Sequence, residues 1–237
     1  MLKNPLTIIA TTILIFISAS CLAQKNWNNT ISENDISRDT IVKKGDTLVF
    51  INKDSSFDHI VAQNLINTFF TVYPQEVKTY NIHSLKTVTI IIDPGYKGVA
   101  ATDNGIVRIN PEWMHKHPED IDVVTHEVMH IVQAYPSNAG PGWITEGIAD
   151  YVRNEFGVNN DKSGWKLPEY KDKQKYTYAY MFTARFFLYL TRKYDKNLVK
   201  DLDSAMRNKE YTSGFWQKET GKTIDELWKD YAASPSI

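Results

Sequence analysis

The chain has 237 residues, of which 42% are hydrophobic and 23% are charged, a balance typical of a globular protein with one sizeable core. With 27 Lys and Arg against 28 Asp and Glu, the net charge is −1, so no basic surplus favours binding to nucleic acid phosphates. A single cysteine excludes both an internal disulfide framework and a cysteine-rich zinc site.

The first 23 residues have the features of an export signal. Lys3 supplies a short positive region, an apolar stretch runs from Leu6 to Ile17, and small residues follow as far as Ala23. The apolar stretch is shorter than the roughly 20 residues of a membrane span. We therefore expect a secreted mature chain with no membrane span. The alternative is lipidation of Cys21 in the sequence Ser-Ala-Ser-Cys, which would anchor the protein to the cell surface.

Residues 24–38 are polar and predict a linker, and residues 39–237 predict a single monomeric domain. The expected elements are a hairpin over 39–52, a helix over 57–73 ending before Pro74, a buried strand over 87–93, and a hairpin over 99–109 turning at Asn104-Gly105. From Pro118 onward the pattern is helical. Because a sheet-rich part (39–117) precedes a helical part (118–237), the sequence predicts an α+β fold with a mostly antiparallel sheet.

The helix predicted from Pro118 to Tyr135 carries the sequence His-Glu-Val-Met-His at 126–130. His126 and His130 are four residues apart, so their imidazoles lie one turn apart on the same side of the helix. Two imidazole nitrogens in this arrangement can bind one zinc ion, and Glu127 can reach a water in an open coordination position. The alternative is a pair of histidines on the surface of a helix.

A second helix, predicted over 142–157, carries two carboxylates one turn apart. Glu146 can supply the oxygen ligand that a site with two histidines lacks, and Asp150 can accept the second N–H of a ligating histidine. Their neighbours Trp143, Ile144 and Ile148 are typical of a buried helix. Two carboxylates in such surroundings favour a bound cation over a solvated helix face.

Four segments resemble the plant basic secretory protein family and its bacterial relatives, which are secreted zinc peptidases of gluzincin type. They are His-Glu-Val-Met-His-Ile-Val-Gln at 126–133, Gly-Trp-Ile-Thr-Glu-Gly-Ile-Ala-Asp-Tyr-Val-Arg at 142–153, Tyr-Met-Phe-Thr-Ala-Arg-Phe-Phe-Leu-Tyr at 180–189, and Lys-Thr-Ile-Asp-Glu-Leu-Trp at 222–228. The resemblance extends from about Phe57 to Tyr231. The chain is not basic, so the polyanion binding that the family name suggests is not expected.

This resemblance implies a zincin-like metallopeptidase domain with His126, His130 and Glu146 as zinc ligands. It also implies that Glu127 is the general base and that Asp150 orients a ligating histidine. A related group of metallopeptidases uses an aspartate as the third ligand, which leaves Asp150 as the alternative to Glu146.

The sequence therefore predicts a secreted zinc endopeptidase acting on peptides or proteins. Tyr180, at the start of a long helix expected to pack near the site, is the candidate donor to the oxyanion. An edge strand at 99–102 or 106–109 is expected to hold the peptide, and Trp165 is a candidate for a binding surface. The alternatives are a non-catalytic, exported or surface-anchored zinc-binding protein and a zinc hydrolase of a non-peptide substrate.

Overall fold

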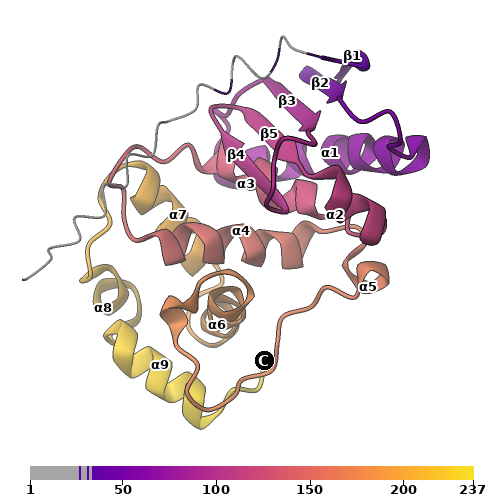
Figure 1. The fold of residues 1–237 in the computed structure, drawn as a ribbon. Coiled ribbons are helices and arrows are strands. Elements are labelled where there is room, and N and C mark those ends of the chain that lie inside the picture. Colours follow the sequence, from indigo (N-terminus) through magenta and orange to yellow (C-terminus); the bar gives the residue numbers. More distant parts are fainter. Residues whose placement is uncertain (1–26, 28–30, 32–33) are drawn as a thin grey trace, which may run out of the picture.

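The computed structural model describes residues 27, 31 and 34–237 (Figure 1). The predicted signal segment 1–23, with Cys21, lies outside the described residues, as does most of the predicted linker. The strands are β1 (Ser37–Lys43), β2 (Asp46–Asn52), β3 (Thr87–Ile92), β4 (Ala100–Asp103) and β5 (Ile106–Ile109). They form a single five-stranded sheet in the order β1-β2-β3-β5-β4.

The sheet is mixed, with fewer antiparallel pairs than the sequence led us to expect. The pairs β1–β2 and β4–β5 are antiparallel, whereas β2–β3 and β3–β5 are parallel. The reason is that β2 and β3 are joined through helix α1 (His59–Tyr80), and such a crossover returns the chain in its original direction. The mixed sheet followed by helices is an α+β fold, as predicted.

Both predicted hairpins are confirmed, and the second residue of each turn is a glycine. Lys44 and Gly45 have φ values of 51° and 92°, and Asn104 and Gly105 have values of 47° and 79°. Two successive residues with positive φ match the twist of a two-residue hairpin. The second hairpin places β4 at the edge of the sheet and β5 inside it. Of the two segments expected to hold a peptide, only 99–102 therefore reaches an open edge.

Alternate residues of the strands enter two different hydrophobic clusters. The larger cluster takes one face of the sheet, for example Phe50, Ile90 and Val107, and continues through the helices. The smaller cluster takes Ile51 and Ile91 on the opposite face, with Ile106. Successive side chains of a strand point to opposite faces of the sheet, and here one of the two faces packs against the helices.

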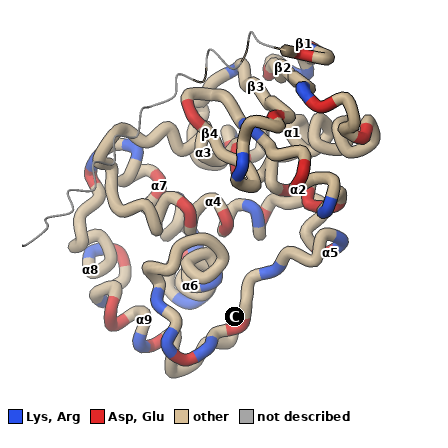
Figure 2. The backbone as a smooth tube through the Cα atoms, viewed as in Figure 1, with Lys and Arg blue, Asp and Glu red and all other residues tan. Residues whose placement is uncertain are grey.

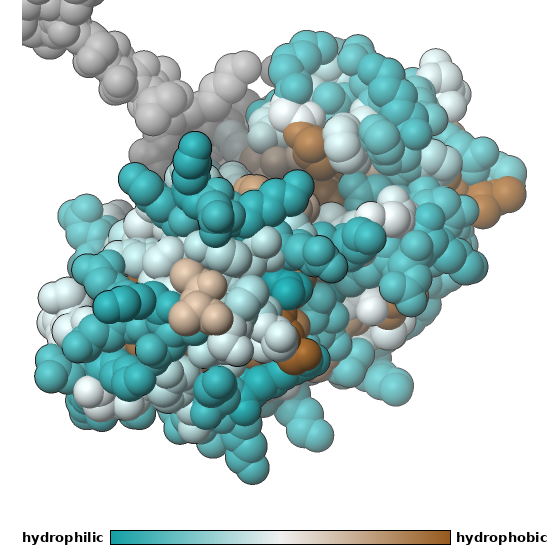
Figure 3. Space-filling model, turned by 90° about the horizontal axis from the view of Figure 1, so that it is seen from below, coloured by the Kyte–Doolittle hydropathy of each residue, from teal (hydrophilic) through white to brown (hydrophobic). Residues whose placement is uncertain are grey.

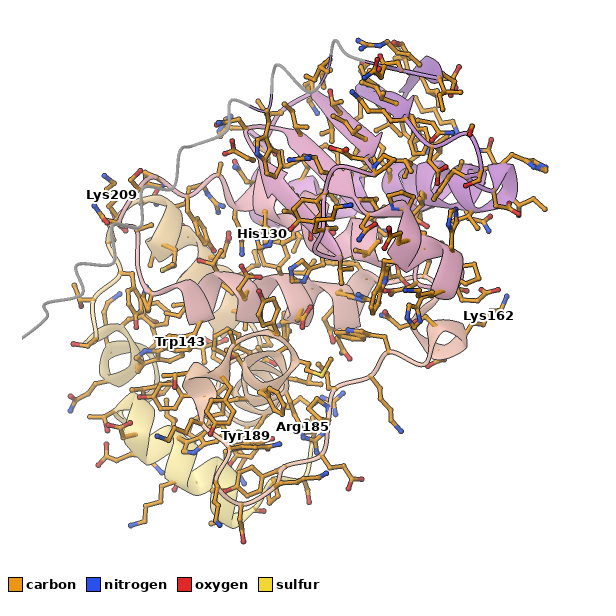
Figure 4. All side chains as sticks on the ribbon, viewed as in Figure 1. His130, Trp143, Lys162, Arg185, Tyr189 and Lys209 are labelled. Carbon is orange, nitrogen blue, oxygen red and sulfur yellow. The ribbon has the colours of Figure 1, made fainter. Side chains whose placement is uncertain are left out.

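The helices with the site lie between the sheet and the C-terminal helices (Figure 1). The helices that follow β5 are α2 (Pro111–Lys116), α3 (Val123–Gln133), α4 (Gly142–Phe156), α5 (Asn160–Ser163), the 3-10 turn η2 (Tyr176–Tyr178), α6 (Tyr180–Lys193), α7 (Leu198–Arg207), α8 (Phe215–Thr220) and α9 (Ile224–Ala233). α3 packs between the sheet and α4, and α6, α8 and α9 lie on the other side of α4. Figure 4 shows this division: His130 lies between α3 and α4, whereas Trp143 points toward the C-terminal helices.

Gly147 on α4 determines how closely α6 approaches the site. A Cβ atom at this position would lie 2.3 Å from Cγ2 of Thr183 and 2.7 Å from its Cβ. Only glycine fits so close an approach. The contact holds the first turn of α6, which begins with Tyr180, beside Glu146.

The prediction that a helix ends before Pro74 is wrong. Helix α1 continues to Tyr80 with Pro74 inside it. Proline removes one helical hydrogen bond, but the residues beyond it, such as Val77, continue the buried face of the helix against α3. Tertiary packing outweighs the local cost of the proline.

Helix α3 begins at Val123, five residues later than the Pro118 start predicted from the sequence. The intervening acidic side chains are used for tertiary contacts. Asp122 is fully buried and accepts hydrogen bonds from Thr125 Oγ1 at 2.9 Å and from the backbone N–H of Val158 at 2.8 Å. Asp122 therefore anchors the segment after α4 to the start of α3.

Glu76 is fully buried on α1, and neither of its carboxylate oxygens has a hydrogen-bond partner among the described residues. Burial raises its pKa well above the usual value, and the charge of His126 offsets only part of the effect. As the pH rises above about 4.3, the unfolded chain releases this proton and the folded chain retains it, so the carboxyl group lowers stability. We therefore expect Glu76→Met to raise the free energy of unfolding at pH 7 by about 1–3 kcal/mol.

The gain should shrink as the pH falls toward 4, because the carboxyl group is then protonated in both states. Denaturant unfolding of the metal-free protein between pH 4 and pH 8 measures it. Glu169→Met is the matched control, because Glu169 is exposed. A Glu76→Met variant that is no more stable than the wild type at pH 7 would contradict this account.

Positive and negative side chains are interspersed along the described chain (Figure 2). The face shown in Figure 3 is mostly hydrophilic, with hydrophobic residues in small separate patches. No helix in the described part of the chain combines the length and the apolar character needed to cross a membrane.

Candidate metal centre and cleft

The antiparallel packing of α3 against α4 brings three of the predicted residues together. His126 Nε2 lies 3.2 Å from His130 Nε2 and 3.3 Å from Glu146 Oε2, and His130 Nε2 lies 3.6 Å from the same oxygen. Within the described residues, this is the group of three or more His, Cys, Asp or Glu side chains that could hold a metal ion.

The three distances test which ion the group fits. Ligand bonds of about 2.0–2.1 Å in a tetrahedron place neighbouring ligand atoms roughly 3.3–3.4 Å apart. The observed separations of 3.2, 3.3 and 3.6 Å lie close to that value. Two imidazoles and one carboxylate are also ligands that zinc accepts, and three protein ligands leave a fourth position open. The residues present therefore fit a zinc ion.

The other ring nitrogen of each histidine is held by a second residue. His126 Nδ1 lies 2.7 Å from Asp150 Oδ1, and His130 Nδ1 lies 2.8 Å from Gln133 Oε1. Gln133 in turn donates from Nε2 to the backbone oxygen of Thr145, at 2.9 Å. If both Nδ1 atoms carry the protons, both Nε2 atoms present lone pairs toward the Glu146 oxygen.

Electrostatics couple His126 to the two carboxylates. Burial by itself lowers the pKa of His126, but the hydrogen bonds to Asp150 and Glu146 outweigh it and raise that pKa to about 10. Burial by itself raises the pKa of Glu146, but the hydrogen bonds to His126 and His130 hold it well below its usual value. The metal-free site is therefore an ion pair, and an entering cation would replace the proton.

Glu127 lines the same cleft and is positioned by the edge strand. Thr102 Oγ1, on β4, lies 2.7 Å from Glu127 Oε2 and 3.0 Å from the Glu127 backbone oxygen. Glu127 Oε1 has no hydrogen-bond partner among the described residues. The carboxylate is thus held through one oxygen, and the other is free to accept a hydrogen bond.

Tyr180 reaches the centre from a strained turn. Ala179 has φ 66° and ψ −174°, and Tyr180 has φ 50°, values that residues with a side chain rarely adopt. The Tyr180 ring lies nearly parallel to that of His126, with centroids 6.1 Å apart. The Glu146 carboxylate first, and burial second, raise the pKa of the Tyr180 hydroxyl. With a pKa above its ordinary value, the Tyr180 hydroxyl stays protonated at neutral pH and is able to donate.

The three ligand candidates, Glu127 and Tyr180 line one cleft of about 1180 Å³. Near the C-terminal end of α3 its walls include Leu85, Ile131 and Ala134. Near the N-terminal end of α3 they include Trp113 and Trp165. The cleft therefore extends past the histidines in both directions, along the edge strand β4.

A family described as BSP, peptidase of plants and bacteria, matches residues 46–231. The chain belongs to this family. The match includes the sheet from β2 onward, the histidine helix α3, the carboxylate helix α4 and nearly all of the C-terminal helices. No curated protein matches the chain.

Solved structures with a similar fold include zinc metallopeptidases. An M1 zinc metallopeptidase from Deinococcus radiodurans is 10% identical, with a TM-score of 0.50 over 85% of this chain and 52% of its own. A two-domain M1 zinc metallopeptidase variant bound to L-tryptophan gives the same four values. At this identity the likeness shows the fold alone. This peptidase-family chain spans about half the length of those proteins.

The structure brings the ligand and catalytic candidates from the sequence into one cleft, namely His126, Glu127, His130, Glu146, Asp150 and Tyr180. It places Glu146, rather than Asp150, beside the two Nε2 atoms, while Asp150 lies behind His126. Sequence reasoning gave no role to Gln133 or Thr102. Gln133 stands three residues after His130, a spacing that could have indicated it. Thr102 carries no such signal, because its contact with Glu127 exists only in the folded chain.

Proposed function

We propose that this chain is an exported zinc endopeptidase. The observation that carries the proposal is the tetrahedral spacing of His126, His130 and Glu146, with the Glu127 carboxylate in the same cleft. A purely structural zinc site needs four closed ligands and has no use for such a base. Export rests on the composition of residues 1–23, with cleavage after Ala23 or lipidation of Cys21 as the two routes.

In this proposal, His126 Nε2, His130 Nε2 and Glu146 Oε2 hold zinc, which when bound lowers the pKa of a water and polarises the scissile carbonyl. Asp150 and Gln133 keep the two histidines in the tautomer that binds. Glu127, held by Thr102, accepts the proton of the attacking water on its open Oε1 and passes it to the leaving amine. Tyr180 donates a hydrogen bond to the oxygen of the scissile carbonyl as negative charge develops there.

Cleavage within a chain is supported by the shape of the cleft, which continues beyond the centre on both sides. Strand β4 borders it, and within the described residues no strand pairs with the edge of β4 that faces away from β5. An extended peptide can hydrogen-bond to such an edge through its main chain. Its scissile bond would then lie over the histidines.

Metal removal tests the proposal. We expect the purified protein to cleave a peptide library, to lose cleavage to background after dialysis against a chelator, and to regain it with one equivalent of Zn²⁺. Product mass spectrometry should show cuts within peptides rather than release of single terminal residues. Circular dichroism of the chelated protein is the control for folding. A zinc-loaded protein that cleaves nothing would contradict the proposal and favour a structural zinc site.

A further inference from the structure

Trp165 differs from the other tryptophans of the chain. Trp27, Trp113, Trp143, Trp216 and Trp228 all belong to, or pack against, one of the two hydrophobic clusters. Trp165 belongs to neither and lines the cleft instead. A large apolar ring that contributes nothing to the core and lies in a cleft is typical of a binding surface.

The Trp165 ring is held in place by α4 and α5. Its indole stacks on the Arg153 guanidinium, whose Cζ lies 4.5 Å from the ring centroid. The Asn160 side chain holds Arg153 through two hydrogen bonds. Its Oδ1 accepts from Arg153 Nε at 3.1 Å, and its Nδ2 donates to the Arg153 backbone oxygen at 2.8 Å. The backbone N–H of Trp165 donates to the Asn160 backbone oxygen at 3.0 Å. The indole is therefore a preorganised platform.

The charges around this platform are already paired. Arg153 and Asp120 are both buried and form an ion pair through Nη2 and Oδ1. The other Asp120 oxygen accepts a hydrogen bond from Trp113 Nε1 at 2.8 Å. Within the described residues, neither Arg153 nor Asp120 is therefore left unpaired to select an acidic or a basic side chain, and the two indoles offer mainly apolar surface.

The platform lies about three residues of extended peptide from the metal centre. Arg153, which backs Trp165, follows the ligand candidate Glu146 by seven residues on α4. Seven residues of helix span about 10 Å, and an extended peptide advances about 3.3 Å per residue. A side chain about three residues from the scissile bond would thus reach Trp165.

We propose that Trp165, backed by Arg153 and flanked by Trp113, forms the subsite for a large apolar or aromatic side chain about three residues from the scissile bond. This inference rests on the proposed function and names its substrate class.

The test compares wild type, Trp165→Ala and Trp165→Phe on matched peptides that carry Phe, Leu, Ala, Lys or Glu at the third position on either side of one cleavable bond. Lys166→Ala is the neighbouring control, because Lys166 is exposed and not among the residues that line the cleft. We expect wild type to favour Phe and Leu over Ala by on the order of 10-fold or more in kcat/KM. Trp165→Ala should lose most of that ratio, and Trp165→Phe should retain it.

A second measurement separates this inference from the proposed function. Calorimetry compares peptide binding to the Glu127→Ala variant and to the double variant Glu127→Ala, Trp165→Ala. Hydrolysis whose Phe-to-Ala ratio is unchanged in Trp165→Ala would overturn the subsite and leave the peptidase intact. Binding that prefers Phe through Trp165, without any hydrolysis, would support the subsite and overturn the peptidase. A preference for Lys or Glu in the wild type would also overturn the subsite.

Discussion

Replacing Glu127 by alanine should lower kcat/KM for peptide cleavage by about 10²–10⁴-fold, the usual contribution of a general base. The reason is positional: Glu127 shares the cleft with the histidines, and Thr102 holds one of its oxygens and leaves the other open. Because Glu127 is not part of the His126, His130 and Glu146 group, zinc content should stay at one equivalent. Initial rates on a single cleaved peptide and metal analysis after dialysis measure the two effects together.

Glu169→Ala is the matched control, since it removes an exposed carboxylate from the loop after α5 and should leave the rate unchanged. Thr102→Val provides a graded test, because it keeps the base and removes its hydrogen-bond donor. Its rate should fall between those of wild type and Glu127→Ala. Full activity of a zinc-loaded Glu127→Ala variant would remove Glu127 from the mechanism.

The elements that the sequence predicted well are those whose information is local. Gly45 and Asn104-Gly105 favour their hairpins because glycine and asparagine accept positive φ values. The spacing of His126 and His130 belongs to the same class.

The failures arise where distant parts of the chain compete with local preference. Pro74 ends a helix in isolation, but Val77 beyond it gains burial against α3 and keeps α1 intact. Asp122 and Asp120 were expected near the start of a helix, and the fold uses them to hold Val158 and Arg153. Parallel pairing of β2 with β3 follows from the packing of α1, which no alternation within a strand reveals.

The candidate site also has one part that the sequence could predict and one part that it could not. Side chains one turn apart on a helix could be assigned to one face before the fold was known. The relation of Glu146 to Asp150 could not, because both lie on the same face of α4. Only the rotation of α4 against α3 decides which carboxylate meets Nε2 and which meets Nδ1.

The rotation of α4 against α3 also predicts how substitutions of Glu146 and Asp150 should change the affinity for Zn²⁺. Glu146→Ala should weaken Zn²⁺ binding by more than about 100-fold, because it removes the oxygen that lies 3.3 Å and 3.6 Å from the two Nε2 atoms. Asp150→Asn should weaken it less, by about 10–100-fold, as expected when a histidine keeps its place but loses the carboxylate behind it. Competition with a chromophoric chelator at fixed pH gives both affinities, and peptide cleavage should fall in the same order.

Asp161→Asn is the matched control for Asp150→Asn, since Asp161 is exposed on α5, and Glu169→Ala again serves for Glu146→Ala. Thermal unfolding of each metal-free variant shows whether a loss of zinc reflects the site or the fold. The ranking is the decisive quantity. If Asp150→Asn loses more zinc than Glu146→Ala, then α4 must rotate on metal binding to bring Asp150 to the ion, and Glu146 is not the third ligand. If the ranking is as expected, the metal-free arrangement of α3 and α4 is already that of the loaded site, and zinc binds without moving either helix.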